Sequence, residues 1–130
     1  MKINGIVNSK ISKALSELGH TDLIAIGDLG LPIDEEKKID ISLKMGSPSF
    51  IEVLEEVLKD FSVEKYFLAS EIETVNPKQE ENIKKLLKDV EVDFVTHEEF
   101  KKKLKDVKYV IRTGENTPYS NIILQSKNIF

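Results

Sequence analysis

Short apolar runs typical of buried strands alternate along this chain with segments whose apolar residues recur at helical spacing. The strand-like runs are residues 23–26, 38–43, 66–68, 90–95, 107–111 and 122–124. The helical pattern is clearest at Ile11, Ala14, Leu15 and Leu18. Strands joined by helices pair in parallel, because each helix carries the chain back to the same edge of the sheet. The sequence therefore predicts an α/β fold with one domain, residues 1–130. We expect three α/β/α layers: a mostly parallel central sheet with helices on both faces.

Capping signals indicate where the helices begin. A polar residue that accepts hydrogen bonds, or a proline at the first helical position, favours a helix start. The signals are Asn8 or Ser9, Ser47-Pro48 (N-cap and first helical residue), Asn76-Pro77 and the capping box Thr96-His97-Glu98-Glu99. Gly19 is expected to end the first helix by adopting a left-handed conformation.

Composition excludes several classes of function. The 130-residue chain has a formal net charge of −4, whereas a nucleic-acid partner favours a basic surface. It has no cysteine, hence no disulfide, thiolate metal ligand or cysteine nucleophile, which suits the cytoplasm. No apolar run approaches the roughly 20 residues of a membrane span, and the start lacks secretory-signal features. We expect a cytoplasmic protein that binds neither nucleic acid nor membrane.

His20 and Asp28 stand at the two ends of the first predicted strand. Histidine both gives and takes protons near neutrality, and a nearby carboxylate is a recurrent catalytic partner. Five extended residues span about 16 Å, however, so the two ends cannot both touch one small ligand. Either the strand is shorter, or the chain bends, or neighbouring subunits each supply part of a site. The purely structural alternatives are a histidine beside the end of a helix and an aspartate that forms a turn.

Two further polar segments suit a ligand rich in hydroxyl groups. His97 lies in the first turn of its predicted helix, where a neutral imidazole donates one hydrogen bond and accepts another. The turn at residues 113–121 is dense in hydrogen-bonding groups and ends in Tyr119-Ser120-Asn121. An exposed helix start and an ordinary polar loop remain the alternatives.

Signatures of cofactor and metal chemistry are missing. The chain has neither G-x-G-x-x-G nor G-K-[ST], and no G-x-S-x-G nucleophile elbow. Two histidines without a cysteine offer few ligands for a transition metal. We therefore expect no cofactor and no metal.

Four blocks of sequence, taken together, identify a family. They are Asn4-Gly5-Ile6-Val7-Asn8, Gly19-His20-Thr21-Asp22, Asp28-Leu29-Gly30-Leu31-Pro32, and Arg112-Thr113-Gly114-Glu115 through Tyr119-Ser120-Asn121. In this order, and over the whole length to Phe130, they resemble the D-ribose pyranase family. The related L-fucose mutarotases have Gly-His-Gly-Asp and Ala-Asn-Phe-Pro at the corresponding places, so Thr21 and Gly30-Leu31-Pro32 favour the ribose enzymes.

The resemblance implies an isomerase that interconverts the pyranose and furanose forms of D-ribose and supplies ribofuranose to ribokinase. It implies that ring opening and closure proceed by general acid–base catalysis without a cofactor, with His20 as the proton donor. It also implies substrate contacts from Asp28, His97, Tyr119, Ser120 and Asn121. Family members form ring-shaped homo-oligomers, commonly decamers, with sites near subunit contacts. Three residues depart from the pattern, since Gly27, Leu29 and Ser120 stand where many relatives have alanine.

Other functions fit the same residues. A mutarotase for another sugar, such as L-fucose, would use them in a differently shaped pocket. A non-catalytic sugar-binding or regulatory protein would present the same loops without changing the rate of ring exchange. A weaker alternative is an anion-binding module with Ser47-Pro48-Ser49 at a helix start.

Overall fold

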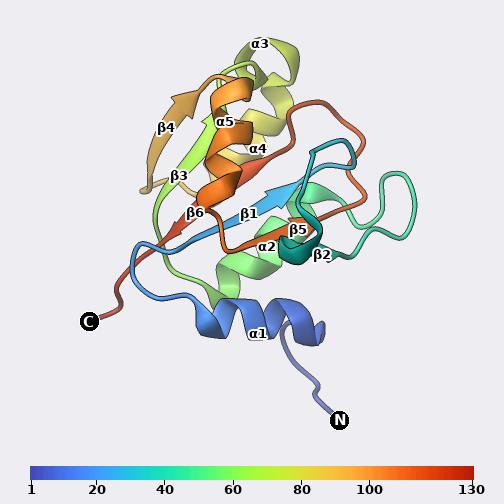
Figure 1. Ribbon diagram of the computed structural model, residues 1–130, viewed down its shortest axis with the longest axis vertical. Coiled ribbons are helices and arrows are strands. Elements are labelled where there is room, and N and C mark those ends of the chain that lie inside the picture. The colour runs from blue at the N-terminus through green and yellow to red at the C-terminus, as the bar shows by residue number, and fades with distance from the viewer.

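A single six-stranded sheet runs through the protein, with helices on both of its faces (Figure 1). The computed structural model describes residues 1–130. The strands are β1 (Leu23–Gly27), β2 (Lys38–Asp40), β3 (Val63–Ala69), β4 (Glu91–Val95), β5 (Tyr109–Arg112) and β6 (Ile122–Ser126). The helices are α1 (Ser9–Glu17), α2 (Phe50–Asp60), α3 (Ile72–Val75), α4 (Pro77–Leu86) and α5 (His97–Lys103), with short 3-10 turns η1 (Glu35–Lys37) and η2 (Leu104–Asp106). None of the helices combines the length and apolar character needed to cross a bilayer.

The strand order is β2-β5-β1-β6-β3-β4, and β6 alone runs against its neighbours. The pairs β2–β5, β5–β1 and β3–β4 are parallel, which confirms the predicted mostly parallel sheet. β6 is reversed because the loop at residues 113–121 carries the chain directly from β5 without a crossover helix. The carboxyl ends of the other five strands therefore share one edge of the sheet with the amino end of β6.

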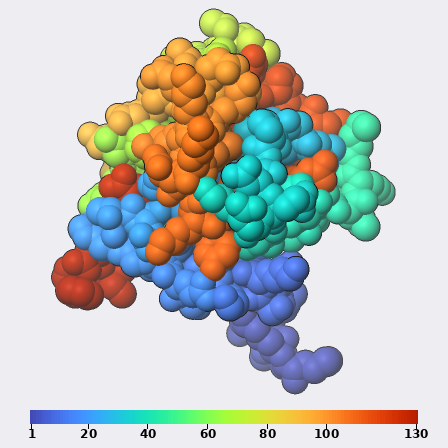
Figure 2. Space-filling view, in the orientation of Figure 1, coloured from blue at the N-terminus to red at the C-terminus, as the bar shows by residue number.

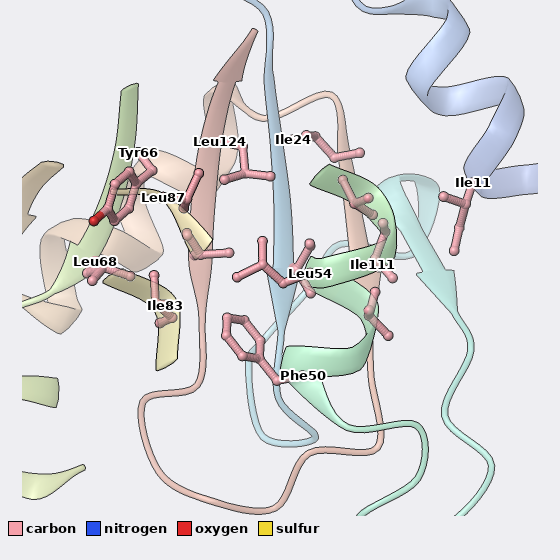
Figure 3. Packing of buried hydrophobic residues seen from close by; sticks show 14 of the residues in the cluster. Ile11, Ile24, Phe50, Leu54, Tyr66, Leu68, Ile83, Leu87, Ile111 and Leu124 are labelled. Atoms are coloured by element: carbon pink, nitrogen blue, oxygen red, sulfur yellow. The ribbon is translucent and has the colours of Figure 1, made fainter. Parts of the chain in front are cut away.

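Two hydrophobic cores fill the spaces on either side of the sheet. Ile24 and Ile26 of β1 point into the larger one, where Leu54 of α2 and Ile83 of α4 also lie (Figure 3). Ala25 of β1 points the other way, into a smaller core that contains Phe100 of α5. Side chains alternate between faces along a strand, so β1 is buried on both sides. The prediction of three layers is confirmed.

The capping predictions were right for α1 and α5. Asn8 accepts hydrogen bonds from the backbone N–H groups of Lys10 and Ile11. Thr96 and Glu99 form the expected capping box. Asn76 precedes α4 as expected, but its side chain donates to the backbone oxygen of Pro118 at 2.8 Å and does not cap the helix.

Two helix boundaries were predicted wrongly. α2 begins at Phe50 with Ser49 as its N-cap, where Ser47 and Pro48 had been expected to play these roles. Ser47 is engaged in a tight turn with Lys44, which removes it from the helix. α1 ends at Glu17, before Gly19, and the left-handed residue of this segment is Thr21, with φ 70°. The hydrogen bond from Thr21 N–H to Ser126 O supports that conformation.

Replacing the true N-cap is expected to destabilise the protein, whereas the same change two residues earlier is not. Ser49→Ala removes the acceptor for the Glu52 N–H and lowers the free energy of unfolding by about 1 kcal/mol. Ser47→Ala is the matched control, because this side chain caps nothing, and its effect stays within about 0.5 kcal/mol. Urea unfolding followed by circular dichroism, at one protein concentration, measures both. Equal losses for the two variants would contradict the assigned helix start.

Candidate active site

A cavity of about 250 Å³ opens at the edge of the sheet where β1 and β4 end. It is lined by Asp28, Gly30, Leu31, His97, Pro118, Tyr119 and Asn121. Asp28 follows β1, His97 begins α5 directly after β4, and Asn121 precedes β6. The sheet topology thus brings together four of the six residues proposed from the sequence: Asp28, His97, Tyr119 and Asn121.

Asp28 is held in a fixed orientation by Asn121. The backbone N–H of Asp28 donates to Asn121 Oδ1 at 2.8 Å, and Asn121 Nδ2 donates back to Asp28 Oδ2 at 3.2 Å. The other carboxylate oxygen accepts the Gly30 N–H at 3.0 Å. Burial raises the pKa of the Asp28 carboxyl above its ordinary value, against the opposing effect of these hydrogen bonds. A half-buried carboxyl of this kind is suited to binding a sugar hydroxyl and to exchanging a proton with it.

His97 and Tyr119 also line the cavity and contact each other. Their rings meet edge to face, with centroids 5.1 Å apart and planes at 83°. The backbone N–H of His97 donates to both carboxylate oxygens of Glu71 at 3.0 Å, which anchors the start of α5. The Nδ1 atom of His97 is buried without a hydrogen-bond partner in the protein.

The hydroxyl of Ser120 faces away from the cavity. Ser120 is fully buried, and its Oγ lies 3.0 Å from Nε2 of Gln79 and 2.8 Å from Oγ1 of Thr117. It thereby ties the loop to α4 rather than lining the cavity. If residue 120 contacts substrate at all, the contact comes from its backbone.

Glu115 supports the same loop from beneath and had not been assigned a role from the sequence. Its Oε1 accepts the N–H of Phe50, the first residue of α2, at 2.9 Å. Its Oε2 accepts the hydroxyl of Thr117 at 2.8 Å. A buried carboxylate at a helix amino end is favoured by the helix dipole. The position of Glu115 directly after the turn glycine was the only signal in the sequence, and the motif alone did not reveal its partner.

His20 lies at the opposite edge of the sheet. It precedes β1 and borders a second cavity of about 300 Å³, together with Leu18, Phe61 and the C-terminal residues through Phe130. β1, five residues long at about 3.3 Å each, separates it from Asp28. One protomer therefore does not bring His20 to the cavity that contains Asp28.

The first cavity can hold a small molecule rich in hydroxyl groups. It offers a carboxyl, an imidazole, a phenol and an amide, which together donate and accept hydrogen bonds. Its volume is below the about 300–1,000 Å³ typical of pockets for drug-sized ligands, so a single sugar ring fits it better than an oligosaccharide. No three histidine, aspartate or glutamate side chains approach one another closely enough to hold a metal ion.

Comparison with known proteins gives one consistent result. The model of the RbsD / FucU transport protein family matches residues 1–128. A protein named D-ribose pyranase from Lactobacillus gasseri is 54% identical over 127 residues, which cover 97% of each chain. The corresponding protein of Geobacillus thermodenitrificans is 53% identical over 127 residues, covering 97% of this chain and 96% of its own.

Solved structures agree with these relatives. Bacillus subtilis RbsD, solved in complex with D-ribose, superposes with a TM-score of 0.95 at 46% identity and covers 100% of both chains. The fucose mutarotase of Streptococcus pneumoniae, solved with L-fucose, has a TM-score of 0.82 at 20% identity and covers 95% of both chains. The second likeness establishes a shared fold only.

We expect Asp28→Asn and Asp40→Asn to change the pH dependence of stability in opposite directions. Burial raises the pKa of Asp28, so the stability it contributes is present below the ordinary value of 3.8 and is lost as pH rises through the raised value. Hydrogen bonds from Ser42 lower the pKa of Asp40, with Arg112 adding to the effect. The stability from Asp40 is therefore present above 3.8 and is lost as pH falls through the lowered value.

The measurement is urea unfolding of the wild type and both variants between about pH 3 and about pH 7. The advantage of the wild type over Asp28→Asn is expected to shrink with rising pH, and its advantage over Asp40→Asn to grow. Parallel trends for the two variants would show that Asp28 is not desolvated as described.

Proposed function

The chain belongs to the RbsD / FucU transport protein family, and we propose that it interconverts the pyranose and furanose ring forms of D-ribose. The full-length likeness to RbsD, which was solved with D-ribose, carries this proposal. The relatives named D-ribose pyranase support the same activity. The protein is then an intramolecular isomerase, and its furanose product serves as the substrate of ribokinase in the cytoplasm.

The reaction needs only proton transfers and a rotation. A proton reaches the ring oxygen while the C1–O5 bond breaks, and the C1 hydroxyl loses its proton to give the open aldehyde. The open sugar then rotates about its carbon–carbon bonds. Its C4 hydroxyl adds to C1 and loses its proton, and the former carbonyl oxygen gains a proton. No electron and no chemical group leaves the sugar, so the interconversion needs no second substrate. Positioned general acid–base groups typically accelerate such steps by about 10²–10⁴-fold.

Each cavity residue has a separate role in the proposed mechanism. Asp28, anchored by Asn121, binds hydroxyls and accepts or returns a proton. His97 offers its imidazole to a second hydroxyl, and Tyr119 presents an aromatic face to the C–H surface of the sugar. Ser120 contributes through its backbone. His20 is the proton donor, as the family resemblance implies.

His20 reaches the sugar only if a neighbouring protomer supplies it. The opposite edges of the sheet hold His20 and Asp28, so a head-to-tail arrangement of protomers would join one edge to the other. Apolar residues at both chain ends project from the body of the protein and are almost fully exposed, among them Ile3 and Phe130 (Figure 2). Such exposed apolar surface favours contact with another copy of the chain. We propose a ring-shaped homo-oligomer, a decamer, with its sites at the contacts between subunits.

Exchange between the anomeric protons of β-ribopyranose and β-ribofuranose is expected to accelerate when catalytic amounts of the protein are added. Two-dimensional NMR exchange spectroscopy measures the rate. His20→Ala is expected to abolish the acceleration, because the proton donor is lost. Unchanged exchange together with ribose-induced shifts in the protein would indicate a binder without activity. Slow ribose exchange with rapid exchange of L-fucose anomers would favour the mutarotase alternative.

Mixing two inactive variants tests whether the site is shared between protomers. His20→Ala and Asp28→Asn each remove one half of the proposed site, so each homo-oligomer is expected to be inactive. After joint unfolding and refolding at equal amounts, about one quarter of the contacts join an intact His20 to an intact Asp28. The mixture should therefore regain about one quarter of the wild-type exchange rate. No recovery, with oligomers formed normally, would place both residues in a site within one protomer.

A further inference from the structure

His20 has a carboxylate beside it at its own edge of the sheet. Its Nε2 lies 3.2 Å from Oε1 of Glu64, which belongs to β3. β3 and β1 are not paired, because β6 lies between them in the sheet. Gln125 of β6 completes the group, since its Nε2 donates to the other carboxylate oxygen of Glu64 at 2.6 Å. Both oxygens of Glu64 are therefore engaged, one with Gln125 and one with His20.

A β-bulge directs Glu64 toward this position. Val63 pairs with Ser126 and Lys65 pairs with Gln125, so β3 has one residue more than β6 between these two pairs. Glu64 is the extra residue and is released from regular pairing. Bulges bend a strand and re-aim a side chain, and they are frequent next to active sites.

The backbone segment that carries His20 is hydrogen-bonded to β6. Thr21, the next residue, adopts φ 70°, a conformation seldom found outside glycine. Its N–H donates to Ser126 O at 3.0 Å, and the Ser126 N–H donates to Asp22 O at 2.9 Å. One end of β6 thus fixes the segment that carries His20 and, through Gln125, the carboxylate that faces it.

We propose that Glu64 is a positioning residue that fixes the ring orientation and the tautomer of His20. This inference rests on the proposed function, in which His20 donates the proton. A carboxylate only accepts hydrogen bonds, so it places the hydrogen of a neutral imidazole on Nε2. The Nδ1 atom then takes the proton that the C1 hydroxyl of the sugar in the neighbouring protomer loses. The imidazolium so formed, held by Glu64, donates that proton to the ring oxygen as the C1–O5 bond breaks. The geometry is that of a carboxylate–histidine pair in which the carboxylate orients the ring.

Electrostatics agree with this geometry. The hydrogen bonds from His20 and Gln125 lower the pKa of Glu64, and the nearby charge of Lys127 adds to the effect, so the carboxyl is ionised at neutral pH. Asp60 also borders the cavity beside His20. The side chains of His20 and Glu64 are 48% and 39% exposed in one protomer, so their pairing contributes little to stability. Loss of Glu64 should therefore affect the reaction and not the fold.

The test compares Glu64→Ala with Glu91→Ala in the full-length protein. Glu91 is a surface carboxylate on β4 that pairs only with Lys65, and Lys65 keeps Asp93 as a partner when Glu91 is removed. We expect Glu64→Ala to lower kcat about tenfold to a hundredfold, the range for losing one charge-assisted hydrogen bond, with KM for ribose and the urea midpoint unchanged. Glu64→Gln keeps a hydrogen-bond acceptor but loses the charge, so its kcat should lie between those of the wild type and Glu64→Ala. Glu91→Ala should match the wild type.

The readout that separates positioning from structure is the ¹⁵N spectrum of histidine-labelled protein above neutral pH. His20 in the wild type is expected to show one tautomer, with hydrogen on Nε2, and in Glu64→Ala a mixture of both. The signals of His97, the only other histidine, serve as the internal reference. Full kcat in Glu64→Ala, or a lowered kcat with an unchanged His20 spectrum, overturns the inference.

His20→Ala in the same assay separates this inference from the proposed function. If His20→Ala keeps the wild-type rate, His20 is not the proton donor. The proposed mechanism is then wrong at His20, whatever the result for Glu64→Ala. If His20→Ala loses the rate while Glu64→Ala keeps it, the proposed function stands and the role of Glu64 fails. Joint loss of rate, with a mixed tautomer in Glu64→Ala, supports both.

Discussion

The antiparallel insertion of β6 between β1 and β3 determines where the candidate functional side chains of this protein lie. β6 starts beside Asn121, which holds Asp28 at one edge of the sheet. It ends with Gln125 and Ser126, which hold Glu64 and the segment of His20 at the other edge. A single strand of five residues therefore supports both groups of side chains. Its central residues, Ile123 and Leu124, are fully buried, so neither end can shift without disturbing a core.

Buried hydrogen bonds hold the loop at residues 113–121 in place. Glu115 links the loop to the first turn of α2, and Ser120 links it to Gln79 of α4. Buried polar groups must find partners, because leaving one unsatisfied costs about 1–3 kcal/mol. With these partners in place, the loop supports Tyr119 in a left-handed conformation, φ 56°, with its ring against His97. Rigidity matters here because orientation of the hydroxyls is a large part of what acid–base catalysis requires.

Sequence patterns predicted the layers and most of one cavity, for local reasons. Apolar periodicity fixes which segments are strands and helices, and polar residues at strand ends then meet at one edge of the sheet. What escaped prediction depends on tertiary contacts. Ser47 and Ser49 flank the same proline, and only the packing of Gly114 N–H against Pro48 O, with the Lys44 turn, decides which one caps α2. Glu64 lies in the polar start of β3, before the apolar run 66–68 that indicates the strand, and no local pattern reveals a bulge set by the register with β6.

The length of β1 explains why a shared site suits the proposed chemistry. A strand that must be buried on both faces cannot be shortened without losing core contacts, so the groups at its ends stay about 16 Å apart. Joining opposite edges of two protomers removes that distance without altering the fold. In the proposed assembly, the contact would also shelter the half-exposed pair of His20 and Glu64 from water and so strengthen their interaction. Under the proposed function, activity depends on assembly, because each protomer carries a proton donor that only its neighbour would use.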